Sequence, residues 1–176
     1  MENLVGSFQN YKSVGDKKKE IVSKINKGEA FTYKEHDVVN YITSLILFME
    51  SQGVNLSPYP EIDLLEDTKY ENSLLGYTGD YNYYDGNIIT VWTAGRHIKD
   101  FMRTVAHELW HHHQILNGVN LETVDVKKLE DPTWSAKEKF LGDFENFTYL
   151  EGDVFLNSNL IFRAWTDAIK QDLIKL

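Results

Sequence analysis

A predicted helix over residues 98–117 constrains the fold of this chain more than any other segment, because its two sides differ in polarity. At about 100° per residue, its apolar side chains gather on one side: Met102, Val105, Leu109 and Leu116. The opposite side carries Asp100, Thr104, His107, His111 and Gln114. The segment therefore predicts a helix that packs through one face, presents two histidines on a polar face, and ends at Asn117-Gly118.

The rest of the sequence predicts three further helices and a small β region between them. The helices are expected at residues 16–27, at 35–52 and, capped by Ser135, at about 136–171. "LLGYTG" (74–79) and "NIITVWT" (87–93) are the clearer strands, separated by a turn in "DYNYYDG" (80–86), and "EIDLL" (61–65) is a weaker one. The order of helices, then a small sheet, then two helices predicts an α+β fold.

The length, net charge and composition of the chain exclude several classes of function. The chain has 176 residues, the size of one domain, so residues 1–176 are expected to form a single domain. Its net charge of −9 argues against nucleic acid and against anionic membranes as partners. There is no cysteine, which excludes disulfides and cysteine ligands. No segment has the pattern of a signal peptide, so a cytoplasmic location is expected.

The residues His107-Glu108-Leu109-Trp110-His111 match the pattern H-E-x-x-H. Two histidines four residues apart project from the same side of a helix, so both imidazoles can bind one metal ion. Glu108 is rotated about 100° from His107, close enough to act on a metal-bound water without binding the metal. The pattern indicates a catalytic Zn²⁺ site.

A catalytic zinc site needs a third protein ligand. In the expected last helix, Glu151 falls in the middle of an apolar stripe made of Phe144, Phe147, Val154, Phe155, Phe162 and Trp165, whereas Asp153 falls on the opposite face. A carboxylate on a buried face needs a charged partner, and either a zinc ion or an arginine would serve. We favour zinc, because the two histidines require a third ligand.

"HELWHHHQ" (107–114), followed by "YLEGDVFLNSNLIFRAWTD" (149–167), resembles the small zinc metallopeptidases encoded by tailed bacteriophages. This resemblance implies a zincin-like fold of the gluzincin type, in which a small antiparallel or mixed sheet packs on the H-E-x-x-H helix and on a long C-terminal helix. It implies Zn²⁺ bound by His107, His111 and Glu151, with Glu108 as the catalytic residue. The substrate would be a peptide or protein, and the location the host cytoplasm.

The same resemblance implies that the strand "NIITVWT" lines the cleft and pairs with extended substrate. The chain departs from the gluzincin pattern at Phe155, because many gluzincins have there an acidic residue that orients a ligand histidine. Asp100 and Gln114 share the histidine face, and either could supply that hydrogen bond.

Several alternatives stay open. The chain could be an inactive zincin-fold module that binds metal, or a helical protein whose histidines lie on the surface by coincidence. Structural roles are expected for His97, as a surface or capping residue, and for His112 and His113. Arg163 could bind a substrate carboxylate, but it is expected to pair with an acid such as Asp167. The residue that stabilises the transition state is not assigned; it would come from this set: Tyr77, Tyr81, Tyr83, Tyr84, His113 and Arg163.

Overall fold

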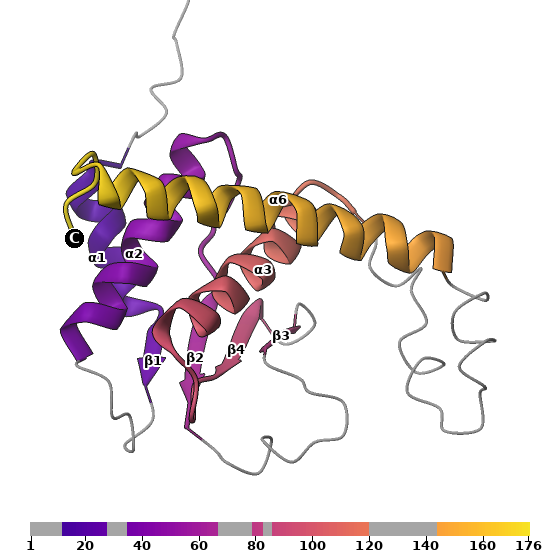
Figure 1. Cartoon of the computed structure of the whole chain (residues 1–176), viewed down its shortest axis with the longest axis horizontal. Coiled ribbons are helices and arrows are strands. Elements are labelled where there is room, and N and C mark those ends of the chain that lie inside the picture. Colours follow the sequence, from indigo (N-terminus) through magenta and orange to yellow (C-terminus); the bar gives the residue numbers. More distant parts are fainter. Residues whose placement is uncertain (1–11, 28–34, 67–78, 83–85, 120–143) are drawn as a thin grey trace, which may run out of the picture.

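The computed structural model describes residues 12–27, 35–66, 79–82, 86–119 and 144–176, and for residues 35, 36, 80 and 144–151 it describes the backbone alone. In this part of the chain the fold is α+β, as predicted, with four helices and a mixed sheet of four strands (Figure 1). The elements in chain order are α1 (Val14–Ser23), β1 (Ile25–Lys27), α2 (Glu35–Ser51), β2 (Glu61–Leu65), β3 (Gly79–Asn82), β4 (Ile88–Trp92), α3 (Ile98–Leu116) and α6 (Phe144–Lys170).

The strands lie in the order β1-β2-β4-β3, and only β3 runs antiparallel to its neighbour. Ile62 lies opposite Ile89, and Leu64 lies opposite Val91. Because side chains alternate along a strand, these four point to one face, where all of them are buried, whereas their neighbours in β2 and β4 are half-exposed. The sheet therefore has one core face, and the helices pack on it.

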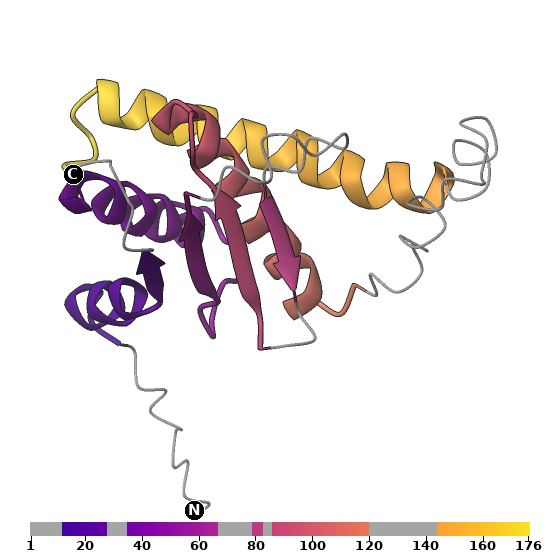
Figure 2. The same cartoon turned by 90° about the horizontal axis from the view of Figure 1, so that it is seen from below.

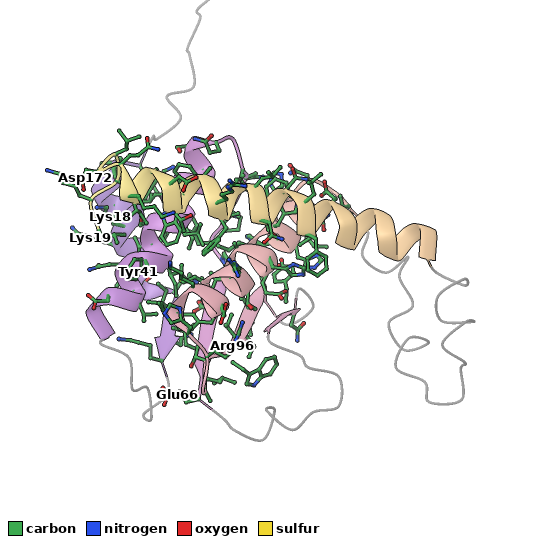
Figure 3. The ribbon with its side chains drawn as sticks, in the orientation of Figure 1. Lys18, Lys19, Tyr41, Glu66, Arg96 and Asp172 are labelled. Atoms are coloured by element: carbon green, nitrogen blue, oxygen red, sulfur yellow. The ribbon has the colours of Figure 1, made fainter. Side chains whose placement is uncertain are left out.

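α3 packs on the core face of β3 and β4, and α6 crosses α3 (Figures 1 and 2). The C-terminal half of α6 also docks on α2, where the indole Nε1–H of Trp165 donates to Ser44 Oγ at 3.0 Å. The Trp165 ring meets Tyr41, labelled in Figure 3, edge to face at 6.0 Å between centroids. The guanidinium of Arg103 lies 5.6 Å from the centre of the Phe162 ring, which adds a cation–π contact between α3 and α6. These contacts fix how α6 crosses α3.

Two predicted boundaries are wrong. The first helix was expected to reach residue 27, but α1 ends at Ser23, and Ile25–Lys27 form β1, which pairs in parallel with β2. A strand therefore lies between the first two helices, because pairing with a distant strand outweighs local helix propensity. β3 includes residues 80–82, which were expected to form a turn, while residues 74–78 of the predicted strand lie outside the described residues.

The other boundaries agree with expectation. α2 and α3 end within a residue of the predicted positions, and Asn117 caps α3 before Gly118, which has a positive φ of 79°. The predicted start of the last helix, residues 135–143, lies outside the described residues. Within the described ranges, none of the helices has the length and apolar character needed to cross a membrane.

Candidate metal centre

The turn between β4 and α3 fixes where the H-E-x-x-H helix begins. His97 is the N-cap of α3, as predicted, and its side chain accepts a hydrogen bond from the backbone N–H of Lys99 at 3.2 Å. Arg96, labelled in Figure 3, donates to the carbonyl of Trp92 and to Thr104 Oγ1, each at 2.8 Å. The arginine thus ties the end of β4 to the second turn of α3, one turn before Glu108.

The two histidines of the motif lie side by side on α3. The ring centroids of His107 and His111 are 4.9 Å apart, with the ring planes at 79°. His107 is half-buried, whereas His111 and Glu108 are only 9% and 7% exposed. The polar face of α3 is therefore covered by neighbouring elements, although the sequence predicted an open face.

Strand β3 covers Glu108. A Cβ atom built on Gly79 would lie 2.9 Å from Glu108 Oε1 and 2.3 Å from Thr104 Cγ2. The absence of a side chain at Gly79 thus lets the backbone of β3 approach the carboxylate directly. Among the described strands β3 is one of the two edge strands of the sheet, whereas β4 pairs on both sides. The expectation that "NIITVWT" pairs with substrate is therefore wrong, because both hydrogen-bonding edges of β4 are already used.

On the other side, α3 contacts α6 through a chain of hydrogen bonds. His111 Nδ1 lies 3.2 Å from Gln114 Oε1, and Gln114 Nε2 donates to Asp153 Oδ2 at 2.8 Å. The same carboxylate oxygen accepts from Trp110 Nε1 at 2.9 Å, and Asn157 Nδ2 donates to Asp153 Oδ1 at 2.7 Å. Of the two residues expected to form a hydrogen bond with a histidine of the motif, Gln114 does so.

Asp153 was missed by the sequence reasoning, which placed it on the outer face of α6. Two of its partners among the described side chains, Trp110 and Gln114, are long side chains of α3. The sequence carried one indication of this interaction. Asp153 and Asn157 are four residues apart, so they are neighbours on the surface of a helix and can form a hydrogen bond.

Phe155 and Glu151 occupy successive turns of α6. The ring of Phe155 lies 4.8 Å from that of His107, although Phe155 is 57% exposed and does not join the buried stripe in which it was expected. The backbone of Glu151 lies in α6, one turn before Phe155, and its side chain is outside the described set. Among the described side chains, no group of three or more histidines and acidic residues could hold a metal ion.

His112 points away from the other two histidines and holds α3 against the sheet. Its Nε2 lies 2.9 Å from the carbonyl oxygen of Pro58, which can only accept, so Nε2 carries the proton. Its Nδ1 lies 2.8 Å from the Tyr81 hydroxyl, which also donates to Asn87 Oδ1 at 2.9 Å. Burial lowers the pKa of His112, opposed by hydrogen bonds to backbone carbonyls. Burial raises the pKa of Tyr81 to about 12. Both residues are structural, as expected for His112.

His112 makes the stability of the protein depend on pH. Because its pKa is lower in the folded state than in the unfolded chain, the unfolded chain binds the proton more readily. The contribution of His112 to the free energy of unfolding should be fully present above about pH 6.5. It should be lost as the pH falls through the folded-state pKa, by about 1.4 kcal/mol for each unit by which folding lowers the pKa.

The test is urea unfolding of the metal-free protein and of His112→Asn at about pH 7.5 and about pH 5.5, on either side of the ordinary histidine pKa. The variant should lose less stability between the two pH values, since other titrating groups contribute equally to both proteins. Equal losses would contradict the assignment.

Among the described side chains, His113 and Asp100 have partners other than the two histidines of the motif. His113 accepts from the backbone N–H of Asn55 at 2.9 Å, which places it against the connection between α2 and β2. Asp100 is exposed and lies 3.8 Å from Arg103. Among the described side chains, the ion pair of Asp167 is with Lys170 at 3.2 Å, so the expected pairing of Arg163 with an acid stays a prediction. Three tyrosines of the predicted set lie outside the described residues: Tyr77, Tyr83 and Tyr84.

Comparison with protein-family models, with curated proteins and with solved structures found no match to this chain.

Proposed function

We propose that this chain is a zinc-dependent peptidase. In this proposal His107, His111 and Glu151 bind the zinc ion, and Glu108 is the general base. The observation that carries the proposal is the pairing of the two imidazole rings, 4.9 Å apart, beside a carboxylate that is 7% exposed and lies against an edge strand.

The donor set fits zinc, which binds neutral imidazole nitrogens and carboxylate oxygens. The order of contacts between α3 and α6 supports Glu151 as the third ligand. Arg103 lies against Phe162, His107 against Phe155, and Gln114 against Asp153, so residue numbers rise along α3 as they fall along α6. One turn beyond His107 is His111, and one turn before Phe155 is Glu151. Asp153, which meets Trp110 and Gln114 of α3, is two residues from Glu151, so in this proposal Glu151 reaches the part of α3 that carries His111.

A bound zinc ion would polarise the substrate carbonyl and lower the pKa of a water molecule toward about 7. Glu108 would accept the proton of the attacking water and pass it to the amine that leaves when the peptide bond breaks.

The substrate would lie along β3. In this proposal the peptide adopts an extended conformation beside the edge strand, as in β-augmentation. Gly79 brings the backbone of β3 against Glu108, so a peptide held beside the strand would have its scissile bond near the general base.

The experiment is a cleavage assay on a mixture of peptides of varied sequence, analysed by mass spectrometry. The proposal predicts discrete cleavage products that disappear with a zinc chelator and return when zinc is added. Products that persist in chelator would contradict a metal-dependent mechanism.

A further inference from the structure

The hydrogen bonds between His111, Gln114 and Asp153 can run in only one direction. An ionised carboxylate has no proton to donate, so the Gln114 group that faces Asp153 must be its amide nitrogen, at 2.8 Å from Oδ2. The other end of the same amide, the carbonyl Oε1, then faces His111 Nδ1 at 3.2 Å. Since a carbonyl only accepts, Nδ1 must carry the proton, and the lone pair of the neutral ring is on Nε2.

We propose that Asp153, acting through the Gln114 amide, holds His111 in the tautomer protonated at Nδ1. Asp153 is thus a positioning residue for His111. This tautomer presents the Nε2 lone pair, which a metal ion would require. The consequence for metal binding rests on the proposed function, whereas the tautomer itself does not.

We call the chain of hydrogen bonds from His111 through Gln114 to Asp153 the relay. Its surroundings favour one fixed arrangement. Gln114 is 4% exposed and His111 is 9% exposed, so water competes little for these hydrogen bonds. Trp110 and Asn157 also donate to the Asp153 carboxylate, one to each oxygen, and hold it in place between α3 and α6. The Asp153 carboxylate has acceptors only, so the Gln114 amide cannot turn around without placing two oxygens against each other.

The relay also takes the place of the acidic residue that orients a ligand histidine in many gluzincins and that this chain lacks. The position four residues after Glu151 is Phe155, which has no hydrogen bond to offer a histidine. Asp153 provides a carboxylate from the same helix by a longer route, with Gln114 in between. A carboxylate behind a ligand histidine fixes the ring and increases its basicity, and the loss of such partners typically costs 10- to 100-fold in metal affinity, as an order of magnitude.

The experiment reads the tautomer directly. Long-range ¹H–¹⁵N NMR spectra of the metal-free, full-length protein at about pH 8, where histidines are neutral, distinguish a ring protonated at Nδ1 from one protonated at Nε2. The variants are Asp153→Asn, which keeps the shape but removes the charge, and Gln114→Ala, which interrupts the relay. Asn157→Ala is the matched control, because it removes a hydrogen bond to Asp153 without touching Gln114. Zinc affinity is then measured for all four proteins by competition with a chelator.

We expect His111 to be protonated at Nδ1 in the wild type and in Asn157→Ala, and to shift toward protonation at Nε2 in Asp153→Asn and Gln114→Ala. Zinc affinity should decrease in the latter two by about 10- to 100-fold. A wild-type His111 protonated at Nε2, or a tautomer unchanged in both relay variants, would overturn the inference. The predicted tautomer shift in a protein that takes up no zinc would support the relay and contradict the peptidase proposal instead.

Discussion

Replacing Glu108 with glutamine should abolish peptide hydrolysis and leave zinc bound. Glutamine has nearly the same shape as glutamate but cannot accept a proton, so the general base is lost while His107 and His111 are untouched. General acid–base groups contribute typically 100- to 10,000-fold in rate, and we expect a loss of kcat of about that size. The measurement is the cleavage rate of a peptide found in the library assay, together with zinc content.

The control for Glu108→Gln is Asp100→Asn, an exposed acidic residue two turns earlier on the same helix, which should retain full activity. Undiminished hydrolysis by Glu108→Gln would contradict the role of Glu108. Loss of zinc in that variant would make Glu108 a ligand rather than the base. The alternative of an inactive metal-binding module predicts that the wild type binds zinc and cleaves no peptide, with Glu108→Gln identical to it.

Gly79→Ala should reduce both the stability and the activity of the protein. The new methyl group would lie 2.3 Å from Thr104 Cγ2 and 2.9 Å from Glu108 Oε1, closer than such atoms can approach. Forcing an extra methyl group into packed surroundings typically costs about 1–3 kcal/mol. The carboxylate of Glu108 would have to move away from β3, so we also expect a decrease in kcat of at least about tenfold, since small displacements of reacting groups have large effects on rate.

The double variant Gly79→Ala/Thr104→Ser separates the two effects. Serine lacks Cγ2 but keeps the hydroxyl that accepts from Arg96 at 2.8 Å. The closest contact of the new methyl group is then removed, whereas its contact with Glu108 remains. Stability in urea should largely recover and kcat should stay low. Recovery of both would show that the decrease in activity came from strain against Thr104, and full activity of Gly79→Ala would contradict the placement of Glu108 against β3.

The helices were the most predictable part of the fold. α2 and α3 carry apolar residues at helical spacing and are followed by Gly53 and by Asn117-Gly118, so their periodicity and end signals fix them locally. β1 could not be found in this way. It is three residues long and continues directly from α1, and it exists because Ile25 pairs with Ile62, far along the chain. Contacts of this kind leave no periodic signal in a short segment.

Only part of the candidate site could be predicted, because only part of it depends on local helix geometry. His107, Glu108 and His111 lie on one helix, so their relative placement follows from helix geometry alone. Gly79 and Asp153 come from other elements, and their roles depend on how β3 and α6 pack against α3. A helical wheel treats α6 as if it contacted a flat surface. It therefore placed Asp153 outside and Phe155 inside, whereas the crossing of two helices lets Trp110 and Gln114 contact the flank.

The central claim is that two histidines of α3 and a glutamate of α6 bind one zinc ion. The most direct test is the metal content, by plasma mass spectrometry, of the protein purified without chelator beside His111→Ala and Glu151→Ala. We predict about one zinc per chain in the wild type, as in other catalytic zinc sites, and its loss in both variants. A wild type that carries no metal and takes up none when zinc is added would contradict the account.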